Sequence, residues 1–348
     1  MKNVCIIGHF GYKKELLNGQ TIKSKTITEE LERQLGADNV GKIDTYGGIK
    51  RYLSLPFQLL HSLKKFNNIV ILPAQRGLRI IAPLLVFFNK FFHRRLFYCV
   101  IGGWLPIVLK NQKGLTNSLH KFDGIFVETQ SMKKKLSEYG FTNIDIMPNC
   151  KKLPILNKNQ LIYPKGVPYK LCTFSRVMKE KGVEDAVNAV ILANKYLGGE
   201  VFSLDIYGQI DSTQAEWFSL LQESFPSYIQ YGGEVPFDKS VECLKDYFAL
   251  LFPTYYAGEG FAGTLLDAFA AGVPVIASAW KYNAEIVEDG KTGKLCKTKD
   301  VQSIIEILKW AYQNVDKWNM MKINCINIAH EYTPQNVIEI LVDQIWRS

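Results

Sequence analysis

The sequence lacks the features that mark disulfide-stapled, zinc-binding and membrane-spanning proteins. Its seven cysteines are scattered singly without a C-x-x-C pair, so we expect small buried side chains rather than disulfides or a zinc site. The longest apolar stretch, residues 78–88, contains Arg79 and is well short of the roughly 18 residues that cross a bilayer. The first residues turn polar too early for a signal peptide. We therefore expect a cytoplasmic protein.

Low-complexity segments are also missing. Hydrophobic residues make up 47% of the chain and charged residues 22%, which is ordinary for globular proteins and excludes a disordered or fibrous chain. At roughly 150 residues per domain, the length of 348 residues indicates two domains.

The positive charge is unevenly placed along the chain. Residues 1–150 contain 22 Lys and Arg against 10 Asp and Glu, so they account for more than the whole net charge of +9. Such an asymmetry favours an acidic partner for the first half, such as nucleic acid, an anionic membrane surface or a phosphorylated substrate. Simple solubility is the alternative explanation.

Short β-branched runs alternate with longer amphipathic stretches, a pattern typical of parallel sheets wound with helices. We predict two Rossmann-like doubly wound α/β domains, residues 1–160 and 168–330, joined by a proline-rich linker around 151–169. A final amphipathic helix, about 334–348, is expected to pack back on the first domain. Strands are expected near 3–8, 40–45, 68–73, 96–102, 124–129, 144–149, 170–176, 201–207, 228–232, 248–253, 273–278 and 293–297.

Ligands of such sheets bind at the carboxyl ends of the strands, so we expect the site in loops facing a central cleft between the domains. Gly258, Gly260 and Gly263 match the spacing of a dinucleotide fingerprint. The match comes too late in its domain, no carboxylate ends the next strand, and the lysine of a phosphate-binding P-loop is missing. What remains is a glycine-rich turn and helix start that favour an anion.

Two carboxylates flank this turn. Glu259 lies within it and Asp267 follows about one helical turn inside the next helix. Carboxylates accept paired hydrogen bonds from neighbouring hydroxyls, so their spacing predicts a sugar nucleotide. A solvated pair of acids at a helix start is the alternative.

Two cations, Arg176 and Lys181, follow the first strand of the second domain. Positive side chains at a helix start oppose the helix dipole unless an anion is present. Their placement therefore indicates a phosphate, whereas a solvated basic loop is the alternative.

The segment from Glu259 through the acid eight positions on, followed by Ala-x-Ala-x-Gly-Val-Pro-Val-Ile-Ala-Ser, resembles the E-x7-E segment of glycosyltransferase family 4, retaining enzymes of GT-B fold. The resemblance is specific over residues 170–297, with one departure, since Asp267 stands where the family has Glu. It implies transfer of a hexosyl or N-acetylhexosaminyl unit, with retention, from a nucleotide-diphosphate sugar that we expect to be UDP-linked. The implied acceptor is lipid-linked or a saccharide, as in bacterial capsule and O-antigen synthesis.

The resemblance also implies roles for single residues. Arg176 and Lys181 would grip the donor diphosphate, and with Glu259 they form the expected catalytic set. No D-x-D motif is present, so we expect neither a metal nor another cofactor. The expected donor-binding residues are Gly19, Gln20, Arg176, Lys181, Glu259, Gly260, Phe261, Ala262, Gly263 and Asp267.

In the first domain the signals are weaker. Gly19 and Gln20, after Asn18, open the first helix, where backbone could approach the donor, although an ordinary helix cap fits equally well. Similar enzymes often have a histidine after a central strand of this domain, but residues 101–104 read Ile-Gly-Gly-Trp. His9 is only a positional substitute.

Residues 79–95 combine apolar side chains, four phenylalanines and a basic end. They predict either a helix buried on the sheet or one docked on an anionic leaflet, helped by Lys133, Lys134 and Lys135. Two other function classes stay open. A non-catalytic nucleotide-sugar sensor would keep Arg176 and Glu259 without turnover, and a nucleic-acid-binding protein would use the basic half. Because no recognised nucleic-acid motif is present, we expect no such partner.

Overall fold

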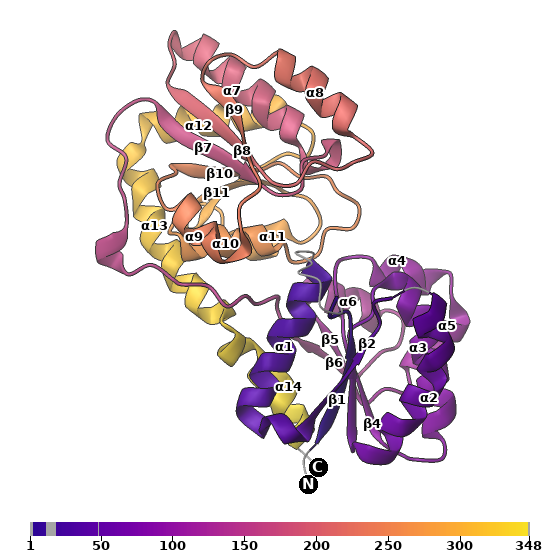
Figure 1. The fold of residues 1–348 in the computed structure, drawn as a ribbon. Helices are drawn as coiled ribbons and strands as arrows, with labels where there is room; N and C mark the ends of the chain where they lie inside the picture. The colour runs from indigo at the N-terminus through magenta and orange to yellow at the C-terminus, as the bar shows by residue number, and fades with distance from the viewer. Residues whose placement is uncertain (1–2, 12–18, 48, 347–348) are drawn as a thin grey trace. The chain divides into compact units, whose positions relative to one another are not determined.

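The computed structural model describes residues 3–11, 19–47 and 49–346 of the chain. The chain forms two compact units, residues 1–152 with 332–348 and residues 153–331. Each unit is built on a six-stranded sheet whose strands pair in parallel (Figure 1). The predicted pair of doubly wound α/β domains is confirmed.

The first sheet has the order β2-β1-β3-β4-β5-β6. Helices α1 and α14 pack on one of its faces, and α2, α3 and α5 cover the other (Figure 1). The strands are β1 (Val4–Gly8), β2 (Val40–Asp44), β3 (Asn68–Ile71), β4 (Arg95–Cys99), β5 (Gly124–Val127) and β6 (Ile144–Ile146). The helices are α1 (Gly19–Leu35), α2 (Ile49–Lys65), α3 (Gln75–Asn89), α4 (Leu105–Lys110), α5 (Lys113–Leu119), α6 (Gln130–Ser137) and α14 (Pro334–Trp346).

The second sheet has the order β12-β11-β10-β7-β8-β9. Its helices lie in two layers, with α7 and α12 in contact on one side and α10 and α13 in contact on the other (Figure 1). The strands are β7 (Tyr169–Phe174), β8 (Phe202–Tyr207), β9 (Ile229–Gly233), β10 (Ala249–Phe252), β11 (Val275–Ser278) and β12 (Gly293–Cys296). The helices are α7 (Val183–Leu197), α8 (Ala215–Glu223), α9 (Ser240–Leu244), α10 (Gly263–Ala270), α11 (Asn283–Ile286), α12 (Val301–Gln313) and α13 (Val315–Ala329).

The unit boundary differs from the predicted linker. The first unit ends at Lys152, and the predicted linker residues from Leu153 onward belong to the second unit. Two contacts explain this: the Leu156 amide donates to the Ala270 carbonyl at 3.0 Å, and the Leu161 side chain is buried over Gly272. These two contacts attach the segment to the second unit, although most of its residues are exposed.

All seven cysteines are free thiols, and all but the partly buried Cys243 are buried. Burial raises the pKa of the Cys5, Cys99 and Cys150 thiols to about 12. A thiol with so high a pKa is a poor nucleophile. The expected role as small core side chains is thus confirmed for the buried six.

Helix α13 carries a lysine inside the core. Lys322 is 1% exposed, and its Nζ donates to the carbonyl oxygens of Tyr247 and Gly272 at 3.0 and 3.3 Å. Burial lowers the pKa of Lys322 to about 8, because an ammonium loses hydration in the core. The folded protein therefore releases this proton at lower pH than the unfolded chain does.

We expect this lysine to make stability rise with pH. Above pH 8 the unfolded chain still holds the proton that the folded one has lost, so unfolding takes up a proton and its free energy grows by about 1 kcal/mol per pH unit. This contribution is missing in Lys322→Met. Urea unfolding of both proteins at pH 7, 8.5 and 9.5 measures the difference. Parallel pH dependences would contradict the assignment.

Candidate functional site

The candidate residues of the second unit lie in three neighbouring loops. Arg176 and Lys181 follow β7, Glu259 follows β10, and a third loop follows β11. These strands are adjacent in the order β11-β10-β7, and parallel strands place their carboxyl ends on one edge of the sheet. The three loops therefore meet at that edge.

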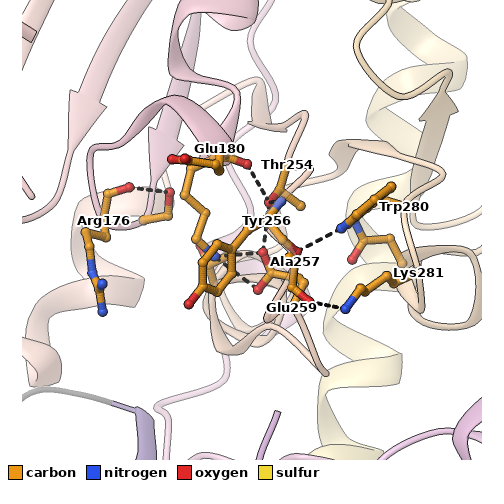
Figure 2. Close-up of polar contacts among 12 residues, drawn as sticks. Arg176, Glu180, Thr254, Tyr256, Ala257, Glu259, Trp280 and Lys281 are labelled. Carbon is orange, nitrogen blue, oxygen red and sulfur yellow. Dashed lines mark hydrogen bonds and ion pairs between the residues drawn. The ribbon is translucent and has the colours of Figure 1, made fainter. Parts of the chain in front are cut away.

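An ion pair joins two of the predicted catalytic residues. Lys181 Nζ lies 2.7 Å from Glu259 Oε2 and 3.0 Å from Oε1 (Figure 2). The two side chains are only 14% and 7% exposed, and the Thr254 hydroxyl donates to Glu259 Oε2 at 2.8 Å. Removing one partner of such a buried pair costs several kcal/mol, because the other charge is left without compensation. The pair therefore fixes both side chains at the sheet edge.

A glycine allows the loops of this pair to approach each other. Gly182, which precedes α7, has φ 74°, and a Cβ there would lie 2.3 Å from the Pro253 carbonyl oxygen. Any side chain would push the loop after β7 away from the loop after β10. Glycine at 182 thus permits the contact between Lys181 and Glu259.

Arg176 lies apart from this pair (Figure 2). Its Nη1 is 3.5 Å from Asp211 Oδ2, and its side chain is 54% exposed. Hydrogen bonds from Thr213, with a smaller contribution from Arg176, lower the pKa of Asp211. An exposed ion pair of this kind is weak, so Arg176 can change partners at little cost.

The residue at the N-cap of α10 has no polar side chain. The N-cap residue Ala262 makes no side-chain hydrogen bond, and the first turn contains no acidic residue. The Thr264 hydroxyl donates to the Phe174 carbonyl at 2.5 Å, which ties the helix start to the end of β7. A helix start of this kind favours an anion near Gly263. The predicted residues Gly260 and Phe261, like Ala262, are buried.

Asp267 is placed differently from Glu259. It lies on α10, is 2% exposed, and its Oδ1 accepts a hydrogen bond from the Ser240 hydroxyl at 2.8 Å. Ser240 begins α9, so Asp267 faces that helix. The structure brings Lys181 and Glu259 into contact, and it gives Asp267 a partner on another element.

Residues at the end of β11 and just after it hold the loop that carries Glu259, a role that the sequence did not predict. Ser278, the last residue of β11, donates through its hydroxyl to the Thr254 carbonyl at 2.5 Å. Trp280 Nε1 donates to the Tyr256 carbonyl at 2.8 Å, and Lys281 Nζ donates to the Ala257 carbonyl (Figure 2). In the sequence, residues 278–280 indicated only the family resemblance and the lack of a carboxylate. Their position at the end of a predicted strand was the available signal.

The predicted residues of the first unit make local contacts there. Gly19 begins α1. A Cβ atom at this position would have space around it, because no heavy atom of the described residues lies within 4 Å, apart from the chain neighbours and the backbone of the same helix. Gln20 Nε2 donates to the Leu72 carbonyl at 3.3 Å, and His9 Nδ1 is 2.7 Å from the Thr21 hydroxyl. Asn18 lies outside the described residues.

The described residues contain no group of three or more His, Cys, Asp or Glu side chains arranged to hold a metal ion. In the same ranges, every helix is too short or too polar to cross a bilayer.

The second unit is similar in sequence to known glycosyltransferases. Residues 160–327 match the family model of glycosyl transferases group 1. The UDP-N-acetylglucosamine–peptide N-acetylglucosaminyltransferase GtfA subunit of Streptococcus gordonii is 29% identical over 178 residues, which are 50% of this chain and 34% of that protein. The chain thus spans about a third of the length of that curated relative.

Solved structures resemble the whole chain. HepE of Anabaena in complex with UDP has a TM-score of 0.75 at 13% identity, and the match covers 99% of both chains. The lipopolysaccharide outer core galactosyltransferase WaaB, in its apo form, has a TM-score of 0.71 at 16% identity, again over 99% of both chains. At such identities the likeness shows the fold alone, and the expected GT-B fold is confirmed.

Proposed function

We propose that this chain, whose residues 160–327 form a group 1 glycosyltransferase domain, transfers a glycosyl unit from a nucleotide-diphosphate sugar to an acceptor hydroxyl. The observation that carries the proposal is the Lys181–Glu259 pair at the sheet edge, beside the start of α10. A cation and a helix start suit a diphosphate, and a carboxylate suits sugar hydroxyls. The cation, the helix start and the carboxylate together suit the diphosphate and the sugar of one nucleotide-diphosphate sugar.

The donor is a UDP-linked hexose or N-acetylhexosamine. Two names support this choice: HepE was solved with UDP, and the GtfA subunit is named for UDP-N-acetylglucosamine. Asp267 binds the ribose, and Gly19 and Gln20 are further donor-binding residues of the proposal. Thermal-shift titrations with UDP, GDP, ADP and dTDP, each free and sugar-linked, test the choice, because a stabilising ligand raises the melting temperature.

The chain lowers the barrier of the reaction by stabilising the leaving diphosphate. In the structure Lys181 pairs with Glu259 and Arg176 with Asp211. Donor binding exchanges these carboxylates for phosphate oxygens, so that both cations and the α10 start face the charge that develops as the glycosidic bond breaks. The freed Glu259 carboxylate then accepts the sugar hydroxyls, and a diphosphate oxygen takes the acceptor proton. We propose retention of anomeric configuration.

The acceptor is lipid-linked or a saccharide, and the product serves surface polysaccharide synthesis. The excess of positive charge in residues 1–150 supports an acidic acceptor such as a lipid diphosphate. WaaB, similar in fold, is named for the lipopolysaccharide outer core. We place the enzyme in the cytoplasm, in peripheral contact with the inner face of the cell membrane.

Turnover is expected to survive EDTA. Arg176, Lys181 and the α10 start supply the positive charge that a metal ion otherwise provides to a leaving diphosphate, and the sequence has no D-x-D motif. Release of UDP from UDP-sugar and acceptor, followed with and without EDTA, measures this. Complete loss of activity that Mn²⁺ or Mg²⁺ restores would overturn the metal-independent mechanism. Donor binding without turnover on any acceptor would identify a sensor instead.

A further inference from the structure

Helix α3 buries one face and exposes another. Ile81, Ala82 and Leu85 are fully buried against the first sheet, as the buried-helix interpretation of residues 79–95 expects. Ile80 and Phe87 are nevertheless 44% and 55% exposed, and Phe91, just beyond the helix, is 74% exposed. Because residues 80 and 87 are spaced by seven, they share the outer side of the helix, and the exposed Phe91 follows in the turn after it. The helix is therefore apolar on its solvent side as well.

The neighbouring helix α2 repeats this arrangement. Leu55 and Leu59 are buried, whereas Leu53 and Phe57 are 73% and 76% exposed. Helices α2 and α3 contact each other in the same layer over the sheet (Figure 1). Their outer sides therefore form one surface, which we call the α2–α3 surface and define by Leu53, Phe57, Ile80, Phe87 and Phe91.

The charge of this region has one sign. Residues 45–122, which include both helices, contain twelve Lys and Arg and no Asp or Glu. Lys90 lies beside the apolar surface, with its Nζ 5.9 Å from the centre of the Phe87 ring. The exposed basic residues of α2, α3 and the turn after it include Lys64, Lys65, Arg76, Arg79 and Lys90.

We propose that the α2–α3 surface docks on an anionic lipid bilayer. Its phenylalanines and leucine enter the boundary between headgroups and acyl chains, and the basic side chains bind the headgroup phosphates. A second copy of the chain is a poor occupant, because two such surfaces would place like charges against each other. Only the purpose of this docking, which is to bring the enzyme to a lipid-linked acceptor, rests on the proposed function.

The same reasoning removes the α6 lysines from the docking surface. Lys134 and Lys135 are exposed, but Met132 and Leu136, the two large apolar residues of α6, are buried. A basic surface without exposed apolar side chains binds anionic lipid only through screened charge. These two lysines therefore serve as a control.

Flotation of the full chain with vesicles tests the proposal. We expect binding to phosphatidylcholine vesicles that contain phosphatidylglycerol, little binding to pure phosphatidylcholine, and release at high salt. Phe57→Ser with Phe91→Ser should lower vesicle binding at least about tenfold, since two aromatic anchors are lost. Two matched double variants should bind like the wild type: Leu220→Ser with Met320→Ser, equally exposed in the second unit, and Lys134→Gln with Lys135→Gln.

Three results would overturn the proposal: equal binding to neutral and anionic vesicles, an unchanged Phe57→Ser/Phe91→Ser protein, or a dimer that these substitutions dissociate. UDP binding, measured by titration of the same samples, separates this outcome from the proposed function. Intact UDP binding without vesicle binding rejects the docking surface alone. Vesicle binding without UDP binding rejects the donor assignment alone.

Discussion

Glu259→Gln lowers kcat and kcat/KM together by about a hundredfold or more, since the lost interaction is one made in the transition state. Glutamine keeps the size of the side chain and one oxygen acceptor, so it isolates the charge. The carboxylate is nearly buried and receives hydrogen bonds from Lys181 and Thr254, so the site is built around a negative group. Initial rates at saturating and limiting donor give both parameters.

Asp267→Asn is the matched comparison for this variant. Asp267 faces Ser240 on α9 and is proposed to bind the ribose, so its neutral amide should raise the KM for the donor and the Kd of free UDP while changing kcat little. The assignment is reversed if Glu259→Gln has a normal kcat while Asp267→Asn is inactive but binds UDP normally. Asp267 would then act in the transition state and Glu259 would not.

Lys181→Met is expected to reduce kcat/KM by about a hundredfold to a thousandfold, the range seen when one preorganised donor to developing negative charge is removed. The same change should weaken binding of free UDP, because the diphosphate loses a cation in the ground state as well. It also leaves the Glu259 carboxylate at the sheet edge without its ion-pair partner, so the melting temperature should fall.

Two further variants make this result specific. Lys181→Arg keeps the charge but replaces a compact ammonium by a planar fork, so it should recover part of the activity. Lys179→Met removes an exposed lysine two residues away and should leave kcat/KM and UDP affinity unchanged. If Lys179→Met is as inactive as Lys181→Met, the basic loop acts as a whole and the assignment to one residue is wrong.

Most strands were predictable because they are short apolar runs between turn residues, whereas β2, β8, β9 and β12 also contain polar residues. Predicted strands near 40–45 and 201–207 correspond to β2 (Val40–Asp44) and β8 (Phe202–Tyr207), and the other ten fall within a few residues of their predicted positions. Buried strands of a parallel sheet are apolar on both faces, so their composition alone marks them. Only their ends were uncertain.

The contacts of the site could be predicted only in part. Motif spacing indicated that Lys181 and Glu259 serve one ligand, but not that they bind each other, because the pairing depends on which strands are neighbours. The bond from Trp280 to the Tyr256 carbonyl joins a side chain to a backbone group, and any residue supplies that acceptor. Such a contact leaves no pattern in the sequence.

The exposed apolar side of α3 was one of two alternatives that the sequence left open. Residues 79–95 are apolar on most sides, so periodicity could not separate the face on the sheet from the face in solvent. Only the packing of Leu85 inward and Phe87 outward distinguishes them.

The return of α14 to the first unit sets an order of events during synthesis. The core of that unit contains Val337, Ile338, Leu341 and Ile345 from α14 together with Val4 and Ile6 from β1. The ribosome must therefore synthesise α14 before this core can close. The second unit, residues 153–331, is continuous and has by then been synthesised in full. Domains generally fold from the amino terminus onward during translation. Here the unit of residues 153–331 is complete before α14 is synthesised, so it is able to fold before the unit into which it is inserted.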